Sequence, residues 1–257
     1  MKFVKFFAFF LAFLCSLAFL SFMIFLVFGF SFFPSTNLEK RYDLIHSISV
    51  DVSSSKLEIK QGDYFGIHIR GSNMIQVNHQ RGELEIEEKK GFFFSKGGPS
   101  TITIFVQDHA ILEDLDISFD AGQVQISNIT AASFSIEQGA GTLTISDSKF
   151  NEADIEGGAG KISITKSLLN NLDLESGAGH VSIDSVLTGH SKIECGVGMI
   201  SLHLIGNKSD YRFLVENGIG NIEIDGEKIS TSMFGEGRHL LELKGGIGTM
   251  KVDFRKE

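Results

Sequence analysis

The chain has 257 residues, a formal net charge of −9, two cysteines and no tryptophan. Lys2 and Lys5 contribute +2, so the remainder carries −9 − 2 = −11, and this acidity disfavours binding to nucleic acid or to anionic lipid headgroups. Cys15 lies in an apolar N-terminal segment, so an intrachain disulfide with Cys195 is not expected.

Residues 6–33 form an apolar segment without charged residues, after a five-residue head at 1–5. As a helix this segment spans about 42 Å at ~1.5 Å per residue, more than the ~30 Å hydrocarbon core of a bilayer. A cleavable signal peptide has a shorter apolar region and a small-x-small exit. We therefore expect an uncleaved transmembrane signal anchor, with late cleavage near Gly29 as the alternative. Lys2 and Lys5 favour a cytoplasmic head and an extracytoplasmic C-terminal domain.

The next two segments lack a regular repeat. Residues 34–43 are polar and predict a juxtamembrane linker. Residues 44–119 alternate between apolar and polar side chains at irregular spacing, which predicts an irregular β cap or first rungs of a solenoid. Within them, residues 91–95 form an apolar insertion that either fills the cap or contacts a membrane or a partner.

Residues 120–257 contain seven copies of a glycine corner followed by a polar-apolar-polar-apolar run, with Asp120 in place of the first glycine of the first copy. The first five copies start 19 residues apart, and the last two follow after 22 and 28 residues. A fixed period of this size predicts a regular β-solenoid in which each copy is one rung. The expected structural corner glycines are Gly139, Gly141, Gly158, Gly160, Gly177, Gly179, Gly196, Gly198, Gly218, Gly220, Gly246 and Gly248.

Alternation predicts a strand on each side of the glycines, with one face buried. Glycine is expected there because the chain turns sharply and approaches the stacked rung closely. The residue between the glycines is apolar, and we expect it to point inward: Ala140, Ala159, Ala178, Val197, Ile219 and Ile247. The predicted fold class is all-β, a single-stranded parallel β-helix of about 19 residues per rung, right-handed by the crossover rule, with an N-terminal transmembrane helix.

A carboxylate stands two residues before the corner in five copies, as Glu137, Glu156, Glu175, Glu194 and Glu216. In a stacked solenoid these side chains form an outward file ~4.8 Å apart, which costs about 1 kcal/mol per neighbouring pair in water. The file is either a solvated acidic edge or a row of weak sites for divalent cations or a cationic partner. The metal interpretation is weak, because no Asp-rich calcium loop accompanies the file.

Other columns offer less chemistry. Cys195 stands at a corner position held elsewhere by Gln138 and Ser176, and is interpreted as an inert small residue. The histidines lack metal-ligand spacing, and dinucleotide, phosphate-loop and nucleophile-elbow motifs are missing, so no catalytic residue, cofactor or metal site is predicted. An outward hydroxyl file is either ordinary strand surface or a contact strip for glycan: Thr144, Ser163, Ser182 and Ser201.

The anchor, the irregular β lead-in, the run Thr-Ile-Thr-Ile-Phe-Val at 101–106 and the tandem Gly-x-Gly copies resemble the bacterial putative-adhesin family of cell-envelope β-solenoid proteins. The similarity runs from about Ser47 to Phe254. Members are described as adhesin-like or of unknown function, so the resemblance implies no catalytic residues. Bactofilins, cytoskeletal β-solenoids that polymerise end to end, are a poorer likeness.

These observations favour a non-catalytic, adhesin-like binding module of the cell envelope. Residues 6–33 hold it in the cytoplasmic membrane, with the domain periplasmic or at the cell surface and with envelope glycan or another envelope protein as partner. One alternative is a self-assembling envelope scaffold of the bactofilin type, which the charged residues 253–257 oppose at the terminal edge. The other is a carbohydrate-active β-helix enzyme, disfavoured because the returns between regular rungs are too short to build a cleft.

Overall fold

The computed structural model describes residues 35–72, 74–88 and 100–256. Residues 36–257 form one compact unit. The predicted transmembrane segment at 6–33 and the apolar insertion at 91–95 lie outside the described residues. Within the described ranges, no helix has the length and apolar character needed to cross a bilayer.

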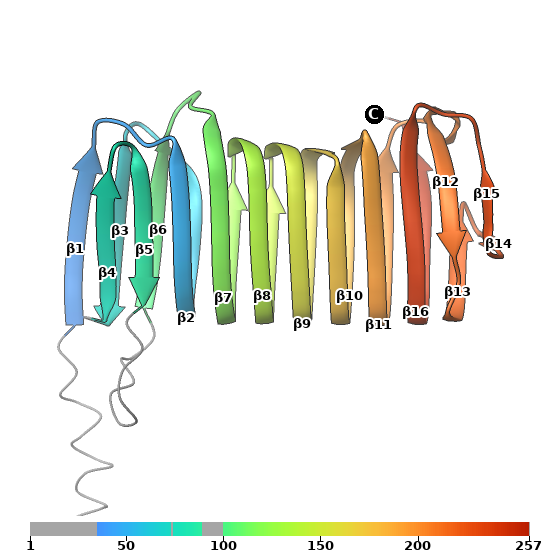
Figure 1. The fold of residues 1–257 in the computed structure, drawn as a ribbon, viewed down its shortest axis with the longest axis horizontal. Coiled ribbons are helices and arrows are strands. Elements are labelled where there is room, and N and C mark those ends of the chain that lie inside the picture. Colours follow the sequence, from blue (N-terminus) through green and yellow to red (C-terminus); the bar gives the residue numbers. More distant parts are fainter. Residues whose placement is uncertain (1–34, 73, 89–99, 257) are drawn as a thin grey trace, which may run out of the picture. The chain divides into compact units, whose positions relative to one another are not determined.

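The unit is all-β, and the described part of the chain contains a single 3-10 turn at Lys208–Asp210. The strands join in one 16-stranded sheet whose main path is β1-β3-β6-β2-β7-β8-β9-β10-β11-β16-β12-β15 (Figure 1). Off this path, β5 pairs with β2 and β4, and β13 pairs with β16 and β14. Their bounds are β1 Ser35–Tyr42, β2 Ser47–Gly62, β3 Phe65–Ser72, β4 Ile75–Gln80, β5 Glu83–Glu88, β6 Ser100–Gln107, β7 Leu112–Ser127, β8 Thr130–Ser146, β9 Lys149–Asn170, β10 Leu172–Thr188, β11 His190–Ile205, β12 Tyr211–Glu216, β13 Ile219–Ile224, β14 Glu227–Ile229, β15 Ser232–Phe234 and β16 His239–Arg255.

Each regular rung is one long bent strand, where the sequence predicted two strands separated by a corner. β8 runs through residues 139–141 without interruption and pairs in parallel with β9 on both sides of the corner. Because the ladder continues through the bend, the backbone remains a strand. In Figure 1 the rungs run down one face, turn at the lower edge and rise on the other face.

The interior is lined by aliphatic columns that run along the ladder, as the alternation predicted. Burial of these side chains is the main stabilising term of such a stack, at roughly 25 cal/mol per Å² of apolar surface. In the first column every side chain is at most 3% exposed: Leu143, Ile162, Val181 and Ile200. In the second column every side chain is fully buried: Ile145, Ile164, Ile183 and Leu202.

The corner glycines are required by the close stacking of the rungs. A Cβ on Gly141 would overlap the carbonyl oxygen of Gly122 in the neighbouring rung. Gly141 also has φ +129°, a conformation that L side chains rarely adopt. The same overlap recurs at the other corners, so the repeat reflects a backbone contact that only glycine permits.

The residue between the two glycines points outward, so the inward prediction was wrong. In β8 the buried positions are Ile136 and Gln138 before the corner, but Leu143 and Ile145 after it. The alternation therefore changes parity at the corner, and Ala140 lies exposed at the apex of the bend. We call this outward row the glycine edge; in spatial order it comprises Ala121, Ala140, Ala159, Ala178, Val197, Ile247 and Ile219.

The last two rungs do not stack in sequence order. β16 pairs with β11 on one side and with β12 and β13 on the other, so the final copy lies inside the stack. Residues 253–257 were predicted to protect the terminal edge, but β14 and β15 pair antiparallel with β13 and β12 at that end. The interval of 22 residues contains the 3-10 turn and β12, and the interval of 28 residues contains β13, β14, β15 and the start of β16.

The predicted boundaries at the N-terminal end also need correction. β2 is already a full rung: it pairs in parallel with β7 along its length and bends near Ser54, where glycine is missing. β7 starts at Leu112, so the predicted boundary between residues 119 and 120 divides a strand. The predicted linker at 34–43 contains β1, a polar strand next to β3.

Candidate functional site

The predicted carboxylate file borders a groove of about 560 Å³ that runs along one face of rungs β7–β11. Its floor includes corner glycines and the residues just before them, such as Gln138 and Ser176. The carboxylates that line it are Asp120, Glu137, Glu156, Glu175 and Glu194. We call this feature the acidic groove.

Four of the five predicted file members are direct neighbours. Parallel pairing aligns Glu137 with Glu156, Glu156 with Glu175, and Glu175 with Glu194. Glu216 is separated from Glu194 by Lys244, because β16 lies between their strands. The row of like charges is therefore interrupted by a cation at its C-terminal end.

A second file beside the first places Lys192 among carboxylates. Asp154 pairs with Asp173, and Asp173 pairs with Lys192. Lys192 Nζ lies 2.6 Å from Glu175 Oε1, 3.4 Å from Asp173 Oδ1 and 3.8 Å from Glu194 Oε2. One ammonium group thus contacts three carboxylates on two neighbouring rungs.

These contacts shift the pKa values of Glu175, Lys192 and Asp154. The hydrogen bond from Lys192 lowers the pKa of Glu175, so this carboxyl is ionised at neutral pH. The same bond raises the pKa of the Lys192 ammonium group. Burial raises the pKa of Asp154, and the nearby charges of Asp173 and Glu175 raise it further. The groove therefore favours a bound cation and opposes further negative charge.

The groove does not have the geometry of a metal centre. Over the ranges that the structure describes, no three His, Cys, Asp or Glu side chains are grouped so that they hold a metal ion. Calcium takes about six to eight oxygen ligands around one point, whereas a file presents its carboxylates one rung at a time. Of the two functional interpretations of the file, the cationic partner fits the arrangement better.

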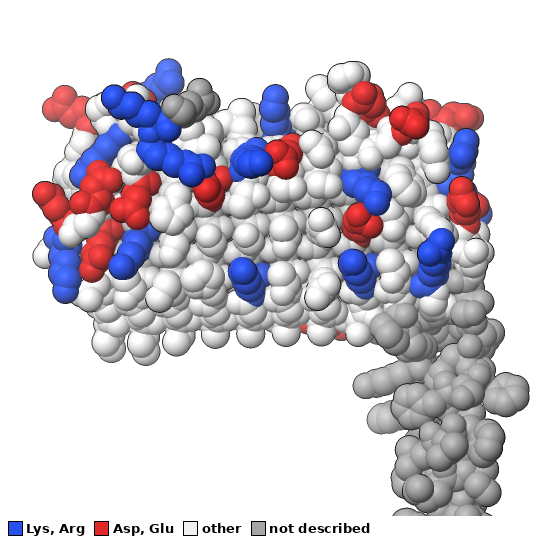
Figure 2. Space-filling model, turned by 180° about the vertical axis from the view of Figure 1, so that it is seen from behind, with Lys and Arg blue, Asp and Glu red and all other residues white. Residues whose placement is uncertain are grey.

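The hydroxyl file lies on the second halves of the strands, and its members stack in register. Thr144, Ser163, Ser182 and Ser201 are half-buried and are followed by Lys251 and then Glu223. Lys251 Nζ lies 3.9 Å from Glu223 Oε2. Figure 2 shows a face on which charged side chains are sparse across the middle.

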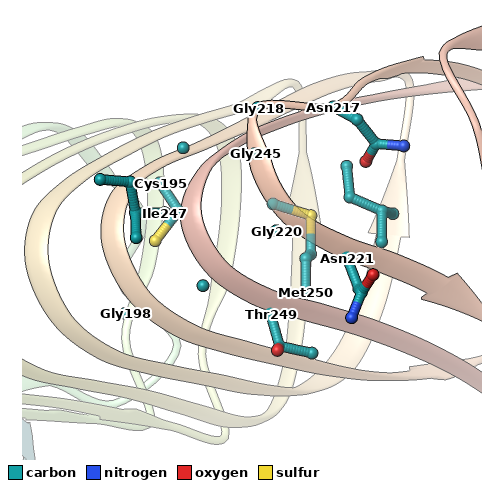
Figure 3. A pocket seen from close by; sticks show the side chains of 13 residues that line it. Cys195, Gly198, Asn217, Gly218, Gly220, Asn221, Gly245, Ile247, Thr249 and Met250 are labelled. Atoms are coloured by element: carbon teal, nitrogen blue, oxygen red, sulfur yellow. The ribbon is translucent and has the colours of Figure 1, made fainter.

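Cys195 lies inside the stack, at the corner of β11. It borders a cavity of about 10 Å³ together with Asn217, Ile222 and Met250 (Figure 3). A volume of this size is at the lower limit for a single water molecule. Burial raises the pKa of the Cys195 thiol, so the group stays protonated at neutral pH and is a poor nucleophile.

Sequence reasoning missed a buried serine ladder at the turns opposite the glycine edge. Ser148 Oγ accepts a hydrogen bond from Ile129 N at 3.2 Å, Ser167 Oγ accepts one from Ser148 N at 3.1 Å, and Ser185 Oγ accepts one from Ser167 N at 3.1 Å. These side chains join successive turns and are structural. Their signal in the sequence is the dipeptides Asp-Ser, Lys-Ser and Asp-Ser at 147–148, 166–167 and 184–185.

The stacked rungs and the open groove define a β-solenoid domain of the toast-rack type, with parallel strands side by side like slices. The chain belongs to the Toastrack DUF4097 family, which it matches over residues 45–234. The family resemblance inferred from the sequence is thereby confirmed.

Several solved structures are similar to this chain. A putative adhesin from Bacteroides fragilis is 14% identical, with 85% of this chain and 96% of that chain covered and a TM-score of 0.48. A putative cell adhesion protein from Clostridium sporogenes is 15% identical (86% and 100% covered, TM-score 0.39), and a putative lipid binding protein from Parabacteroides distasonis is 13% identical (85% and 96% covered, TM-score 0.49). Such low similarity carries no information about the ligand of this chain. No curated protein matches it.

Proposed function

We propose that this protein is a non-catalytic binding module of the cell envelope that takes a cationic partner in the acidic groove. The apolar segment at 6–33 anchors it in the cytoplasmic membrane, and Lys2 and Lys5 retain the head in the cytoplasm. The partner is another envelope protein that presents lysine or arginine side chains.

The position of Lys192 is the observation that carries this proposal. Its ammonium group lies within 4 Å of three carboxylates and therefore acts as an internal example of the bound cation. Towards β7 the file continues as Glu156 and Glu137, neither of which is paired with a Lys or Arg in the described part of the chain. Exposed ion pairs contribute about 0–1 kcal/mol each, so a partner must engage several rungs at once.

The protonation states of two groups limit the catalytic roles open to them. At neutral pH the lowered pKa of Glu175 keeps it a carboxylate, which cannot act as a general acid, and the raised pKa of Cys195 keeps it a thiol, which is a poor nucleophile. A glycoside hydrolase needs two carboxyl groups on opposite sides of the scissile bond. The carboxylates of the acidic groove instead follow one another along files of parallel strands.

The ends of the stack disfavour the self-assembling scaffold. At the N-terminal end β3 and β4 pair antiparallel with β6 and β5, and at the C-terminal end β14 and β15 pair antiparallel with β13 and β12. Another copy could continue the parallel ladder only by displacing these strands.

A binding experiment tests the role of the groove. We expect the full chain in nanodiscs to bind fluorescent oligolysine, with an affinity that falls as salt rises. The double variant Glu137→Gln, Glu156→Gln should bind about tenfold more weakly, since two ion pairs are lost. The control Glu223→Gln, outside the groove, should bind like the parent chain. Equal affinity in the parent and the double variant, or binding of a neutral envelope glycan in place of oligolysine, would refute the proposal.

Membrane orientation is tested separately. Protease added to spheroplasts should degrade the domain and leave a small N-terminal fragment in the membrane. Protection of the domain until the spheroplasts are lysed would contradict the extracytoplasmic location.

A further inference from the structure

The glycine edge changes in character along the stack. Its residues are alanines from β7 to β10 and branched aliphatic residues from β11 onward. Val197, Ile247 and Ile219 are neighbours in the ladder and are 50%, 54% and 78% exposed. Met199, 46% exposed, lies two residues beyond Val197 on the same rung. The C-terminal end of the edge is therefore an exposed apolar ridge.

On the face that Figure 2 shows, charge is distributed unequally between the two edges of the stack. The lower edge in Figure 2 is a nearly continuous row of uncharged side chains, whereas charged side chains occur along the upper edge. Asp120 is a charged residue of the glycine corners, and it lies in β7, several rungs from Ile219. The turns opposite the glycine edge include the charged residues Asp147 and Lys166. On the face that Figure 2 does not show, the carboxylates of the acidic groove adjoin the glycine corners of β7–β11, whereas Ile247 and Ile219 of the ridge lie beyond the groove, on β16 and β13.

The described chain enters the unit at this same edge. Asn37 Oδ1 lies 3.0 Å from His68 Nε2 and the Arg41 guanidinium lies 4.1 Å from the Tyr64 ring, so β1 runs antiparallel to β3. β3 ends near Ser100, which pairs with Ser55 at the corner of β2. The first residues of β1 are therefore level with the glycine edge (Figure 1).

The predicted membrane span ends two residues before β1. Two extended residues reach at most about 7 Å, so the start of β1 must lie close to the bilayer surface if residues 6–33 cross it. The glycine edge would then lie near the bilayer at the β1 end of the stack. The apolar ridge at the other end of the edge would provide a second contact with lipid.

We propose that the glycine edge rests on the bilayer, with Ile219 and Ile247 inserted among the lipids at the end of the stack remote from the anchor. This inference depends on the membrane anchoring in the proposed function. Since the anchor holds the edge at high effective concentration near lipid, a few aliphatic side chains suffice for contact. A zwitterionic bilayer is the appropriate surface, because the net charge of −11 outside the head is repelled by anionic headgroups. In this orientation the long axis of the stack lies along the membrane, and the acidic groove opens to the side.

Tryptophan fluorescence tests the orientation without background, because the chain contains no native tryptophan. Three single-tryptophan variants of the full chain are reconstituted in phosphatidylcholine vesicles: Ile219→Trp on the edge, Ile111→Trp just before β7 at the opposite end of the strands, and Phe19→Trp in the predicted span. Ile219 and Ile111 are 78% and 68% exposed, so neither change disturbs the core. With dibrominated phosphatidylcholine, emission should be lost from the first and third variants, while the second should respond only to aqueous iodide.

The outcomes separate this inference from the anchoring proposal. Loss of emission from the Phe19→Trp variant alone keeps the anchor and refutes the lipid contact. No loss from either refutes the anchor as well. Protection of the Ile219→Trp variant from both quenchers would indicate a second copy or another protein on the ridge, and would also refute the inference. Adding Ile247→Asp to the Ile219→Trp variant should abolish quenching by brominated lipid, whereas adding Ile111→Asp should not.

Discussion

Lys192 Nζ donates a hydrogen bond of 2.6 Å to Glu175 Oε1 across one step of the ladder. This bond joins the two carboxylate files of the acidic groove, because Lys192 also lies 3.4 Å from Asp173. The raised pKa of Lys192 contributes stability that is complete below the unfolded value of 10.5 and is lost as pH rises through the folded value. The lowered pKa of Glu175 contributes stability that is complete above the unfolded value of 4.5 and is lost as pH falls through the folded value.

Replacement of Lys192 should therefore reduce the stability of the domain most at pH values between the pKa values of these two groups. We expect Lys192→Gln to lower the free energy of unfolding by about 1 kcal/mol at neutral pH and low salt, since the pairs are solvent-exposed and individually weak. The deficit should shrink in acid and at high salt. Urea unfolding of the full chain in detergent measures it; a deficit that is the same in acid and at neutral pH would contradict the assignment.

Ionisation of Asp154 should have the opposite effect on stability. Because its pKa is raised above 3.8 in the folded state, its ionisation removes stability as pH rises through the folded value. Asp154→Asn should stabilise the domain by up to about 0.5 kcal/mol at neutral pH and have no effect in strong acid. Asp116→Asn, on the same face, removes the same charge and serves as the control. Melting temperatures across the pH range test this, and a destabilised Asp154→Asn variant would be inconsistent with it.

The glycine corners predict a steric effect that is separable from backbone conformation. Gly141→Ala should cost about 3 kcal/mol or more, because the methyl group meets the Gly122 carbonyl and φ is +129°. Gly206 has φ +143°, and a methyl group there would have no heavy atom within 4 Å, so Gly206→Ala incurs only the conformational cost. Unfolding free energies compare the two variants; equal losses would mean that the rungs do not stack this closely.

The serine ladder predicts a loss of stability when Ser167 is replaced, although the sequence alone shows only a polar residue in a turn. Ser167→Ala leaves the backbone N–H of Ser148 without its acceptor inside the stack, which should cost about 1–3 kcal/mol. Ser163→Ala, in the half-buried hydroxyl file, should change stability by less than about 0.5 kcal/mol. Hydrogen exchange at the Ser148 amide provides an independent readout and should accelerate only in the Ser167→Ala variant.

The fold was predictable where local alternation and close stacking determine it. The period of 19 residues identified the rungs, and the alternation placed Ile145 and Ile164 in a common buried column. Glu137, Glu156, Glu175 and Glu194 were placed in one file, and the structure aligns them as neighbours. The handedness of the coil and the transmembrane helix stay predictions.

The parts that were missed depend on contacts between distant segments. The corner of β2 lacks glycine, and Glu88 stabilises it by accepting a hydrogen bond from Ser53 N at 2.8 Å, from a strand 35 residues away. The outward position of Ala140 follows from a parity change that a strictly alternating pattern does not reveal. The separation of Glu216 from Glu194 follows from the placement of β16, which the repeat pattern alone does not encode.

The interior position of β16 has a consequence for biosynthesis. As the chain leaves the ribosome, β2, β7, β8, β9, β10 and β11 can add in order, each on the one before. After β11 this sequential growth stops, because the next neighbour of β11 in the sheet is β16, which is translated after β12 and β13. β12 and β13 must wait beside an unfinished stack until residue 255 emerges and β16 enters between them and β11. The end of the stack therefore cannot assemble in the order of synthesis, because β12 and β13 are connected to β11 through β16.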